Sequence, residues 1–448
     1  MSSGSARWTP PRLKPVAPGA KATWLELFYD LVFAFAFIRV TLTASVSPES
    51  LLRAMLLISL LWFLWITFST LGNFVRGDEG VMPPATIISV GATFIAALVL
   101  PSAYGSGKHP ADYLFALCYL LVRGLQVLVY WERVRRDPPL RPRWPFLIGP
   151  PALGSALLLV AAFIPYFVAR HVFVVRAVLL GLTVAGAYAI SVIFGFRELE
   201  RIATRHWADR YAQILLIALG ESIIAVGTAR RPSQVLPPTW PLLSSAVLGL
   251  VIITTMAFTY FDHHMVAGEH ALREARGRRQ TAIARDAYVF IHLPMIIGIL
   301  LFSLGLNDVH LAVQNPAAPA AGHPSAQSVS LLYGGICLYG AALLGFQRRT
   351  GQQIRWFEIA SWPPLLLAIP AVALLPSMYA LLLLAAYVVA STALKHLKNI
   401  PERMRIRAAS RERERTVEAA IRAHERAVRA AEAHQRSADA TWPDGHGG

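Results

Sequence analysis

Runs of about twenty apolar residues recur along this chain, and they restrict its fold more than any other feature. They begin at residue 24 and continue almost to residue 395. A run of this length can cross the hydrocarbon core of a bilayer as an α-helix. The composition agrees, because only 15% of the 448 residues are charged, whereas a soluble protein carries about 25%. The sequence therefore predicts an integral membrane protein.

The runs predict an all-α fold, a polytopic bundle of transmembrane helices. Backbone polar groups inside lipid must be satisfied within each span, and the alternating pattern of about ten residues that marks a β-barrel strand is missing. A faint similarity between the first and seventh spans favours two six-helix halves. We expect about twelve spans, at 24–46, 51–72, 82–105, 112–131, 147–168, 172–196, 211–229, 242–262, 283–305, 328–346, 357–375 and 377–395.

The distribution of basic residues predicts the orientation. With the N-terminus inside, about 34 of the 42 Lys and Arg residues fall in segments on the cytoplasmic side, and about 6 fall in external loops. Such an excess follows the positive-inside rule. We expect a multi-pass protein of the bacterial inner membrane with both termini in the cytoplasm. The net charge of +16 is then a consequence of topology, and we expect the lipid bilayer, not nucleic acid, as the partner.

Three regions follow from this pattern. Residues 1–22 are a Pro-rich cytoplasmic arm without the short apolar core of a signal peptide, 23–395 form the transmembrane domain, and 396–448 form a basic cytoplasmic tail with a helical pattern. Apolar residues in the tail repeat over barely two heptads, fewer than a coiled coil needs. The tail is expected to lie in solvent or along the membrane, or to form a homo-oligomer through residues 400–436.

Several ionisable residues lie near the cytoplasmic ends of spans. Glu26 and Asp30 are four residues apart, on one face of the first helix, where they could line an aqueous entrance. Pro294 lacks a backbone donor and is expected to kink the ninth span. The ionisable residues near the cytoplasmic side also include Asp262, His263 and His264, which end the eighth span, and His292, early in the ninth. For the three residues that end the eighth span, snorkelling to the interface and helix capping remain alternatives.

Two charged residues lie near the middle of their spans. Glu221 and Arg123 are each about ten residues from both ends of a helix, so neither can reach water along it. We expect them to pair, either as a structural ion pair or as a site whose charge changes when substrate binds. Gly220 is expected to let a neighbouring helix approach Glu221. Arg39 lies in the outer half of the first span and is expected to snorkel outward.

Three sequence blocks resemble the bacterial low temperature requirement A family of polytopic membrane proteins. They are "WLELFYDLVFAFAF" from residue 24, "RYAQILLIALGESIIAVG", which contains Glu221, and "YFDHH" followed by "RDAYVFIHLPMIIGILLFSLGL" at 260–306. The likeness covers roughly residues 22–395, and Arg39 departs from the neutral polar residue that the family pattern suggests. The resemblance implies a membrane topology. It implies no settled biochemical activity.

The ionisable residues inside the spans and at their cytoplasmic ends favour a secondary transporter or ion pathway over other functions. In this hypothesis Glu221 binds a proton or cation, Arg123 tunes that site, and Glu26, Asp30, Asp262 and His292 connect it to the cytosol. The expected substrate is a small ion or solute. A membrane enzyme acting on a lipid or lipid-linked substrate and a receptor or scaffold remain alternatives. Since no HExxH, GxSxG or P-loop motif occurs, we expect no catalytic residue, metal or cofactor.

Overall fold

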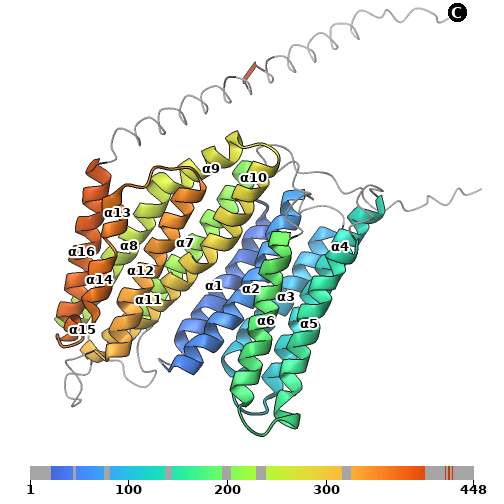
Figure 1. The fold of residues 1–448 in the computed structure, drawn as a ribbon, viewed down its shortest axis with the longest axis horizontal. Coiled ribbons are helices and arrows are strands. Elements are labelled where there is room, and N and C mark those ends of the chain that lie inside the picture. Colours follow the sequence, from blue (N-terminus) through green and yellow to red (C-terminus); the bar gives the residue numbers. More distant parts are fainter. Residues whose placement is uncertain are drawn as a thin grey trace, which may run out of the picture. The chain divides into compact units, whose positions relative to one another are not determined.

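A computed structural model describes most of the chain, and every regular element in the part that it describes is a helix (Figure 1). The all-α prediction is confirmed for these residues. The chain divides into two units, Met1–Thr392 and Ala393–Gly448. The expected oligomerisation segment 400–436 lies outside the described residues, apart from four of them. The described ranges are 22–43, 47–74, 81–136, 144–193, 203–228, 239–314 and 324–398, with Ala419, Arg422, Ala423 and Arg426.

The first six long helices follow the predicted spans closely. Several of these helices begin or end at a proline or a charged residue. Pro48 and Pro110, for example, are the first residues of their helices, where the backbone N–H that proline lacks would have no partner within the helix. They are α1 (Trp24–Thr43), α2 (Pro48–Phe74), α3 (Met82–Val99), α4 (Pro110–Arg136), α5 (Trp144–Phe167) and α6 (Val172–Ile193), with a 3₁₀ turn, η1 (Leu100–Ser102), after α3.

The second group is longer and less regular. Two of its membrane-crossing helices contain π-helical segments, η3 and η4, and one predicted span is divided into short pieces. The elements are α7 (Thr204–Thr228), α8 (Trp240–Thr259), η3 (Tyr260–His264), α9 (Met265–Glu274), α10 (Arg278–Ile283), η4 (Ala284–Phe290), α11 (Ile291–Gln314), α12 (Ala326–Arg349), α13 (Trp356–Ala360), α14 (Pro363–Leu367), α15 (Ile369–Val372) and α16 (Ser377–Lys398).

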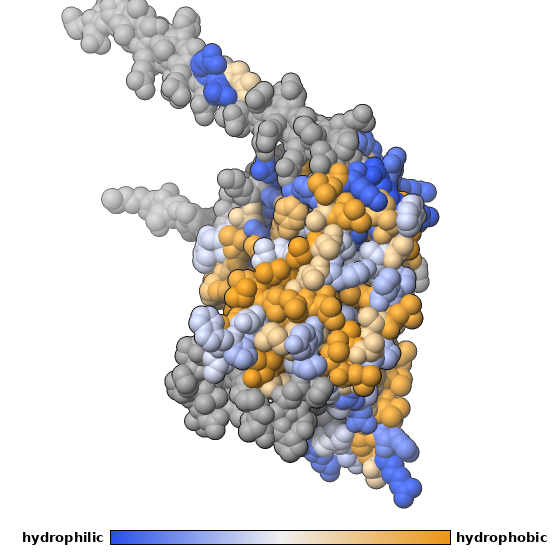
Figure 2. Space-filling view, turned by 90° about the vertical axis from the view of Figure 1, so that its left-hand side faces the viewer, coloured by the Kyte–Doolittle hydropathy of each residue, from blue (hydrophilic) through white to orange (hydrophobic). Residues whose placement is uncertain are grey.

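Nine helices among the described residues are long and apolar enough to cross a membrane. Large apolar side chains such as Leu98, Leu117 and Val178 are exposed on them, as expected where lipid replaces water. Figure 2 shows hydrophobic residues gathered across the middle of one face and hydrophilic residues towards two opposite ends. The spans are Pro48–Gly72, Met82–Ser102, Pro110–Glu132, Ile148–Phe167, Val172–Ala189, Trp240–Glu274, Arg278–Val313, Ala326–Arg349 and Ser377–Lys398.

The predicted span 357–375 is wrong as a single helix. The structure has α13, α14 and α15 there, with turns between them. Pro363, Pro364 and Pro370 fall at the starts of α14 and α15. A proline inside a helix removes a hydrogen bond and clashes with the preceding turn, so this apolar segment forms a chain of short helices.

The predicted end of the eighth span at residue 262 is also wrong. Residues 260–264 form the π-helical segment η3, and the helix continues through α9, so that Trp240–Glu274 is one long element. A second π-helical segment, η4, ends at Phe290, four residues before Pro294. The kink expected at Pro294 stays a prediction, and the irregular backbone of this long helix precedes the proline. π-Helical turns inside α-helices often occur at functional sites.

The packing order of the first group recurs in the second. In the first group α1 packs against α2 and α3, and α3 packs against α4. In the second group α7 packs against α8 and α11, and α11 packs against α12. The two groups meet where α1 contacts α7 and α11, near the middle of the view in Figure 1. The seam between α1 and α7 therefore lies between two similarly built sets of helices.

Small residues hold α11 and α12 together. A Cβ atom added at Gly335 on α12 would lie 2.5 Å from the amide nitrogen of Phe302 and 2.6 Å from the carbonyl oxygen of Gly298, both on α11. Neither backbone atom can move aside cheaply. This contact is the close helix approach that small residues permit in membranes.

We expect Gly335→Ala to lower the stability of the protein by about 1–3 kcal/mol, because the added methyl group overpacks this contact. The neighbouring Gly334 has open space at the same position, so Gly334→Ala is a matched control with little expected effect. Thermal unfolding in detergent, followed by size-exclusion chromatography, compares the two variants. Equal melting temperatures would contradict the close packing of α11 and α12.

Candidate functional site

The seam between α1 and α7 joins side chains that are always 180 residues apart. Glu26 contacts His206, Asp30 contacts Arg210 and Thr41 contacts Glu221. A constant difference means that the two helices run parallel and in register. The contacts extend over residues 26–41, or about 22 Å at 1.5 Å per residue. Separations of 4 and 11 residues return to the same face of a helix, so α1 presents one polar face to α7.

Asp30 and Arg210 form the central contact of this seam. The Nη2 atom of Arg210 donates to Oδ1 of Asp30 at 2.8 Å, and both side chains are only 1% exposed. The indole nitrogen of Trp65 on α2 donates to the same oxygen at 2.7 Å. The guanidinium also lies 5.7 Å from the Trp65 ring centre, a cation–π distance. Asp30 is therefore buried inside the bundle and does not line an open entrance, and its partner Arg210 lies just before the predicted span 211–229.

Glu26 has a local role as well as a contact across the seam. The backbone and hydroxyl of Thr23 both donate to its Oε2 atom, at 2.7 Å and 3.1 Å, and its own N–H donates to the Thr23 hydroxyl at 3.4 Å. This reciprocal pattern is a capping box at the start of α1. His206 Nε2 lies 3.3 Å from the same Oε2. Glu26 thus fixes the first turn of α1 and its position against α7.

Several polar atoms along the seam are buried without a hydrogen-bond partner among the described residues. They include Oε1 of Glu26, Oδ2 of Asp30, Nδ1 of His206, and Nε and Nη1 of Arg210. Such atoms are uncommon in folded proteins, and each one is available to a ligand or an ordered water. Some of these residues line one small pocket, formed by Leu25, Glu26, Tyr29, Phe68, Met82, Thr86 and Arg210.

Glu221 lies at the other end of the seam. It is 1% exposed, and the Thr41 hydroxyl on α1 makes a short hydrogen bond with its Oε1 atom. The Ser303 hydroxyl on α11 lies beside the same carboxyl group without forming a hydrogen bond of good geometry. The Oε2 atom of Glu221 has no partner within the described ranges. This carboxyl group is therefore surrounded by hydroxyls from both groups of helices.

Arg123 does not pair with Glu221 in the structure. Its Nη1 atom donates to the Thr67 hydroxyl on α2 at 2.7 Å and to Oε1 of Gln126 at 3.1 Å. Gln126 in turn donates to the backbone carbonyl of Leu64 at 2.9 Å. The prediction paired Glu221 with Arg123 by depth alone, and depth does not determine which helices are neighbours. The depth expected for Glu221 is also wrong, because α7 starts at Thr204 and Glu221 lies in its last third. Arg123 instead holds α4 against α2.

His292 is buried in an aromatic cluster. Its Nδ1 atom lies 3.0 Å from the carbonyl oxygen of Ala287, and its Nε2 atom lies 2.9 Å from the Tyr260 hydroxyl. A carbonyl only accepts, so Nδ1 carries the proton and Nε2 accepts from the tyrosine. Tyr211 connects this cluster to the Asp30 site, since its ring lies 5.2 Å from His292 and 4.9 Å from Trp65. The two sites are joined by packed aromatic rings.

The other residues of η3 lie on the long helix Trp240–Glu274, which also carries Tyr260. His264 is buried, with Nδ1 2.7 Å from Oε1 of Gln352 and Nε2 2.9 Å from Nε2 of Gln347 on α12. Asp262 is part of η3 and half-buried. The structure therefore links His292 to η3 through Tyr260 and to the Asp30 site through Tyr211, whereas His264 contacts Gln347 and Gln352.

Sequence reasoning missed His206 and Arg210. It started the seventh span at residue 211 and counted Arg210 as a loop residue, whereas α7 starts at Thr204. A usable signal was present, because His206 and Arg210 have the same spacing of four residues as Glu26 and Asp30. The expectation for Gly220 is wrong, because a Cβ atom added there would meet nothing within 4 Å. Glycine at this position therefore permits no close helix contact.

We expect Gly72→Ala to disturb the Glu26 carboxylate. An added Cβ atom would lie 2.0 Å from Oε1 and 3.2 Å from Cδ of Glu26, so the carboxylate would have to move away from Thr23 and His206. Loss of these contacts should lower the free energy of unfolding by about 1–3 kcal/mol. The change is detected as a lower melting temperature in detergent. Gly91→Ala on α3 is the control, since its Cβ position is open. An unchanged melting temperature would show that Glu26 can move without loss.

Comparison with known proteins agrees with the membrane fold. A family model described as bacterial low temperature requirement A protein (LtrA) matches residues 21–393. An uncharacterized protein of Rhizobium meliloti (strain 1021), RA0937, is 28% identical over 317 residues, which cover 65% of this chain and 70% of that protein. The family match contains all of the seam between α1 and α7, together with η3, η4 and α11. The chain therefore belongs to the bacterial low temperature requirement A family.

Proposed function

We propose that this protein is a secondary transporter or ion pathway in which the carboxyl groups at the α1–α7 seam take part in transport. The observation that carries the proposal is the constant register of the seam, which places three acidic side chains, buried and partly unpartnered, between two similarly packed groups of helices. Ionisable groups inside membranes are costly, and those that occur usually serve ion or substrate pathways.

The ion pair between Asp30 and Arg210 is the link that uptake of a proton or small cation would weaken. Neutralising Asp30 removes the attraction to Arg210, and neutralising Glu26 removes the attraction to His206 when the imidazole is charged. Either change lowers the free energy of separating α1 from α7. Alternating access in many transporters is a movement of one set of helices against another around a site near the middle of the membrane.

The proposal includes a topology of about twelve membrane passes in two related halves, made of the nine candidate spans, α1, α7 and the chain of short helices α13, α14 and α15. α1 and α7 contain more charged residues than a typical membrane span, but the charged side chains of one helix contact those of the other inside the bundle. We therefore include both helices among the membrane passes. Basic residues concentrated on one side of the chain's spans support an orientation in the inner membrane with both termini in the cytoplasm. We also propose that residues 400–436, basic and rich in alanine, mediate contacts with lipid or with a second copy of the chain.

Transport is tested with purified protein in liposomes that contain a pH-sensitive dye or a sodium-sensitive or potassium-sensitive dye. We expect Glu221→Gln to reduce the observed proton or cation flux at least about tenfold, because the amide cannot take up a charge inside the bundle. The matched control is Glu358→Gln, which alters another buried acidic side chain, on α13. Normal flux in Glu221→Gln would end the proposal for this residue.

A further inference from the structure

A small pocket lies at the Glu26 end of the seam, between four helices. Its lining consists of Leu25, Glu26 and Tyr29 on α1, Phe68 on α2, Met82 and Thr86 on α3, and Arg210 on α7. The volume of this small pocket is about 10 Å³, which is about the space that one water molecule needs. The small pocket is therefore suited to a water molecule and excludes an organic substrate or a hydrated metal ion.

Three side chains of this lining have buried polar atoms that lack a hydrogen-bond partner among the described residues. They are Oε1 of Glu26, the hydroxyl of Tyr29, and Nε and Nη1 of Arg210. Oε1 of Glu26 lies against Gly72 on α2, one helical turn beyond Phe68. A buried water makes about three hydrogen bonds to such groups. The small pocket offers it an acceptor, a donor and a hydroxyl that can act as either.

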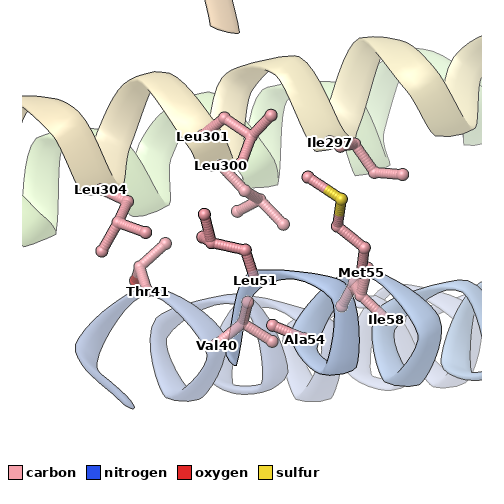
Figure 3. A pocket seen from close by; sticks show the side chains of 10 residues that line it. All are labelled: Val40, Thr41, Leu51, Ala54, Met55, Ile58, Ile297, Leu300, Leu301 and Leu304. Atoms are coloured by element: carbon pink, nitrogen blue, oxygen red, sulfur yellow. The ribbon is translucent and has the colours of Figure 1, made fainter. Parts of the chain in front are cut away.

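An apolar pocket at the opposite end of the seam provides a comparison (Figure 3). Aliphatic side chains of α1, α2 and α11 point towards one another across it, and Thr41 is the one polar residue among the described residues of its lining. The Thr41 hydroxyl already contacts the Glu221 carboxyl group and backbone carbonyl oxygens of α1. Apolar cavities of this kind stay dry. The two pockets therefore differ in their capacity to bind water.

Glu26 is the acid in the lining of the small pocket. Its Oε2 atom accepts from Thr23 and lies 3.3 Å from His206, which leaves Oε1 to take up a proton. A proton binds to one oxygen, whereas a metal cation such as Mg²⁺ or Ca²⁺ needs several oxygen ligands and is repelled by Arg210. Among the described residues, α2 and α3 add no ionisable side chain to this lining. The other ionisable neighbours of Glu26 are Tyr29, Asp30, His206 and Arg210.

We propose that the small pocket binds one water molecule between Glu26 and Arg210, and that this water passes protons to Oε1 of Glu26. The inference names a proton as the ion of the proposed pathway and rests on that proposed function. In each transfer, a proton that reaches the water from the cytoplasmic side of the proposed orientation displaces another proton from the water to Oε1. The water is unchanged, and the carboxylate becomes a neutral acid. Arg210 also contacts Asp30, so the change in charge acts on the central ion pair.

Radiolytic labelling tests for the water. Purified full-length protein in lipid nanodiscs is exposed to X-rays, which convert bound water to hydroxyl radicals, and oxidised peptides are identified by mass spectrometry. Met82 lines the small pocket and is 2% exposed, so its sulfur should be oxidised. Met256 on α8 is equally buried and should remain unmodified, as should Met55 in the apolar pocket. Equal oxidation of Met82 and Met256, or an unmodified Met82, would overturn the inference.

Thr86→Ile tests whether the water carries protons. The change replaces a hydroxyl in the lining by a larger alkyl group that takes the space of the water. It should remove both the oxidation of Met82 and the proton flux into liposomes. Thr254→Ile makes the same change at an exposed position of α8 and should leave both unchanged. Folding of the two variants is checked by size-exclusion chromatography, and unreduced proton flux in folded Thr86→Ile would overturn the relay.

The choice of ion is tested on the unchanged protein. Replacing sodium and potassium by N-methylglucamine on both sides of the liposome membrane should leave the proton flux intact. Flux that stops without sodium or potassium would overturn the inference and leave a cation transporter in place. Oxidation of Met82 without flux of any ion would instead contradict the transporter and the relay together, while the water site would stand.

Discussion

Arg210→Met is expected to lower the free energy of unfolding by about 3–5 kcal/mol, since removing one partner of a buried ion pair leaves the other charge uncompensated. Asp30 is 1% exposed and cannot turn towards water. After the change, Trp65 is the one side chain among the described residues that still donates to it. The loss should appear as a lower denaturation midpoint of the purified protein in detergent, followed by tryptophan fluorescence.

The double variant Asp30→Asn/Arg210→Met separates charge from packing. It removes both charges, so that no uncompensated ion remains, and it should be more stable than Arg210→Met alone. The difference between the single and double variants measures the coupling of the two residues. If Arg210→Met unfolded at the same denaturant concentration as the unchanged protein, the ion pair would not be buried as described.

Arg176→Met is expected to have an effect of similar size, about 3–5 kcal/mol, at a site away from the seam. Arg176 on α6 is fully buried and forms a short ion pair with Asp112 at the start of α4. It also donates to the carbonyl oxygens of Gly105 and Gly107 in the loop before α4, and to Ala161 at the end of α5. One side chain thus connects α6, α5 and this loop.

The exposed Arg170, six residues earlier, provides the control. Arg170→Met should leave the denaturation midpoint nearly unchanged, because surface substitutions away from special features usually have effects within about 0.5 kcal/mol. Both variants are measured in the same detergent by the same fluorescence change. Equal stability of Arg170→Met and Arg176→Met would contradict the buried position of Arg176.

The helical fold could be predicted from hydropathy because length and apolarity decide whether a segment can enter lipid. The error at 357–375 was avoidable, since three prolines were visible in that segment. The π-helical segments could not be predicted from the sequence, because a π-turn depends on whether neighbouring helices supply hydrogen-bond donors for the displaced carbonyls. The carbonyl of Val289 in η4, for example, accepts a hydrogen bond from Trp62 on α2.

The site was predicted in part. The inward orientation of Asp30 followed from the cost of charge in lipid, and the spacing of Glu26 placed it on the same face. The partners of Asp30 and Glu26, namely Arg210 and His206, could not be identified in this way. The cost of a charge in lipid indicates that a side chain turns inward, but it does not indicate which helix that side chain meets. Arg210 was counted as a loop residue for the same reason, although Asp30 neutralises it inside the bundle.

The most direct test compares two neutral double variants in liposomes, with flux expressed per molecule that elutes as folded protein. Asp30→Asn/Arg210→Met removes the central ion pair of the seam, and Asp112→Asn/Arg176→Met removes a buried pair of the same kind outside it. The expected result is that the first variant loses proton or cation flux and the second keeps it. Undiminished flux through the first variant would contradict a working role for the seam and leave it as a structural contact.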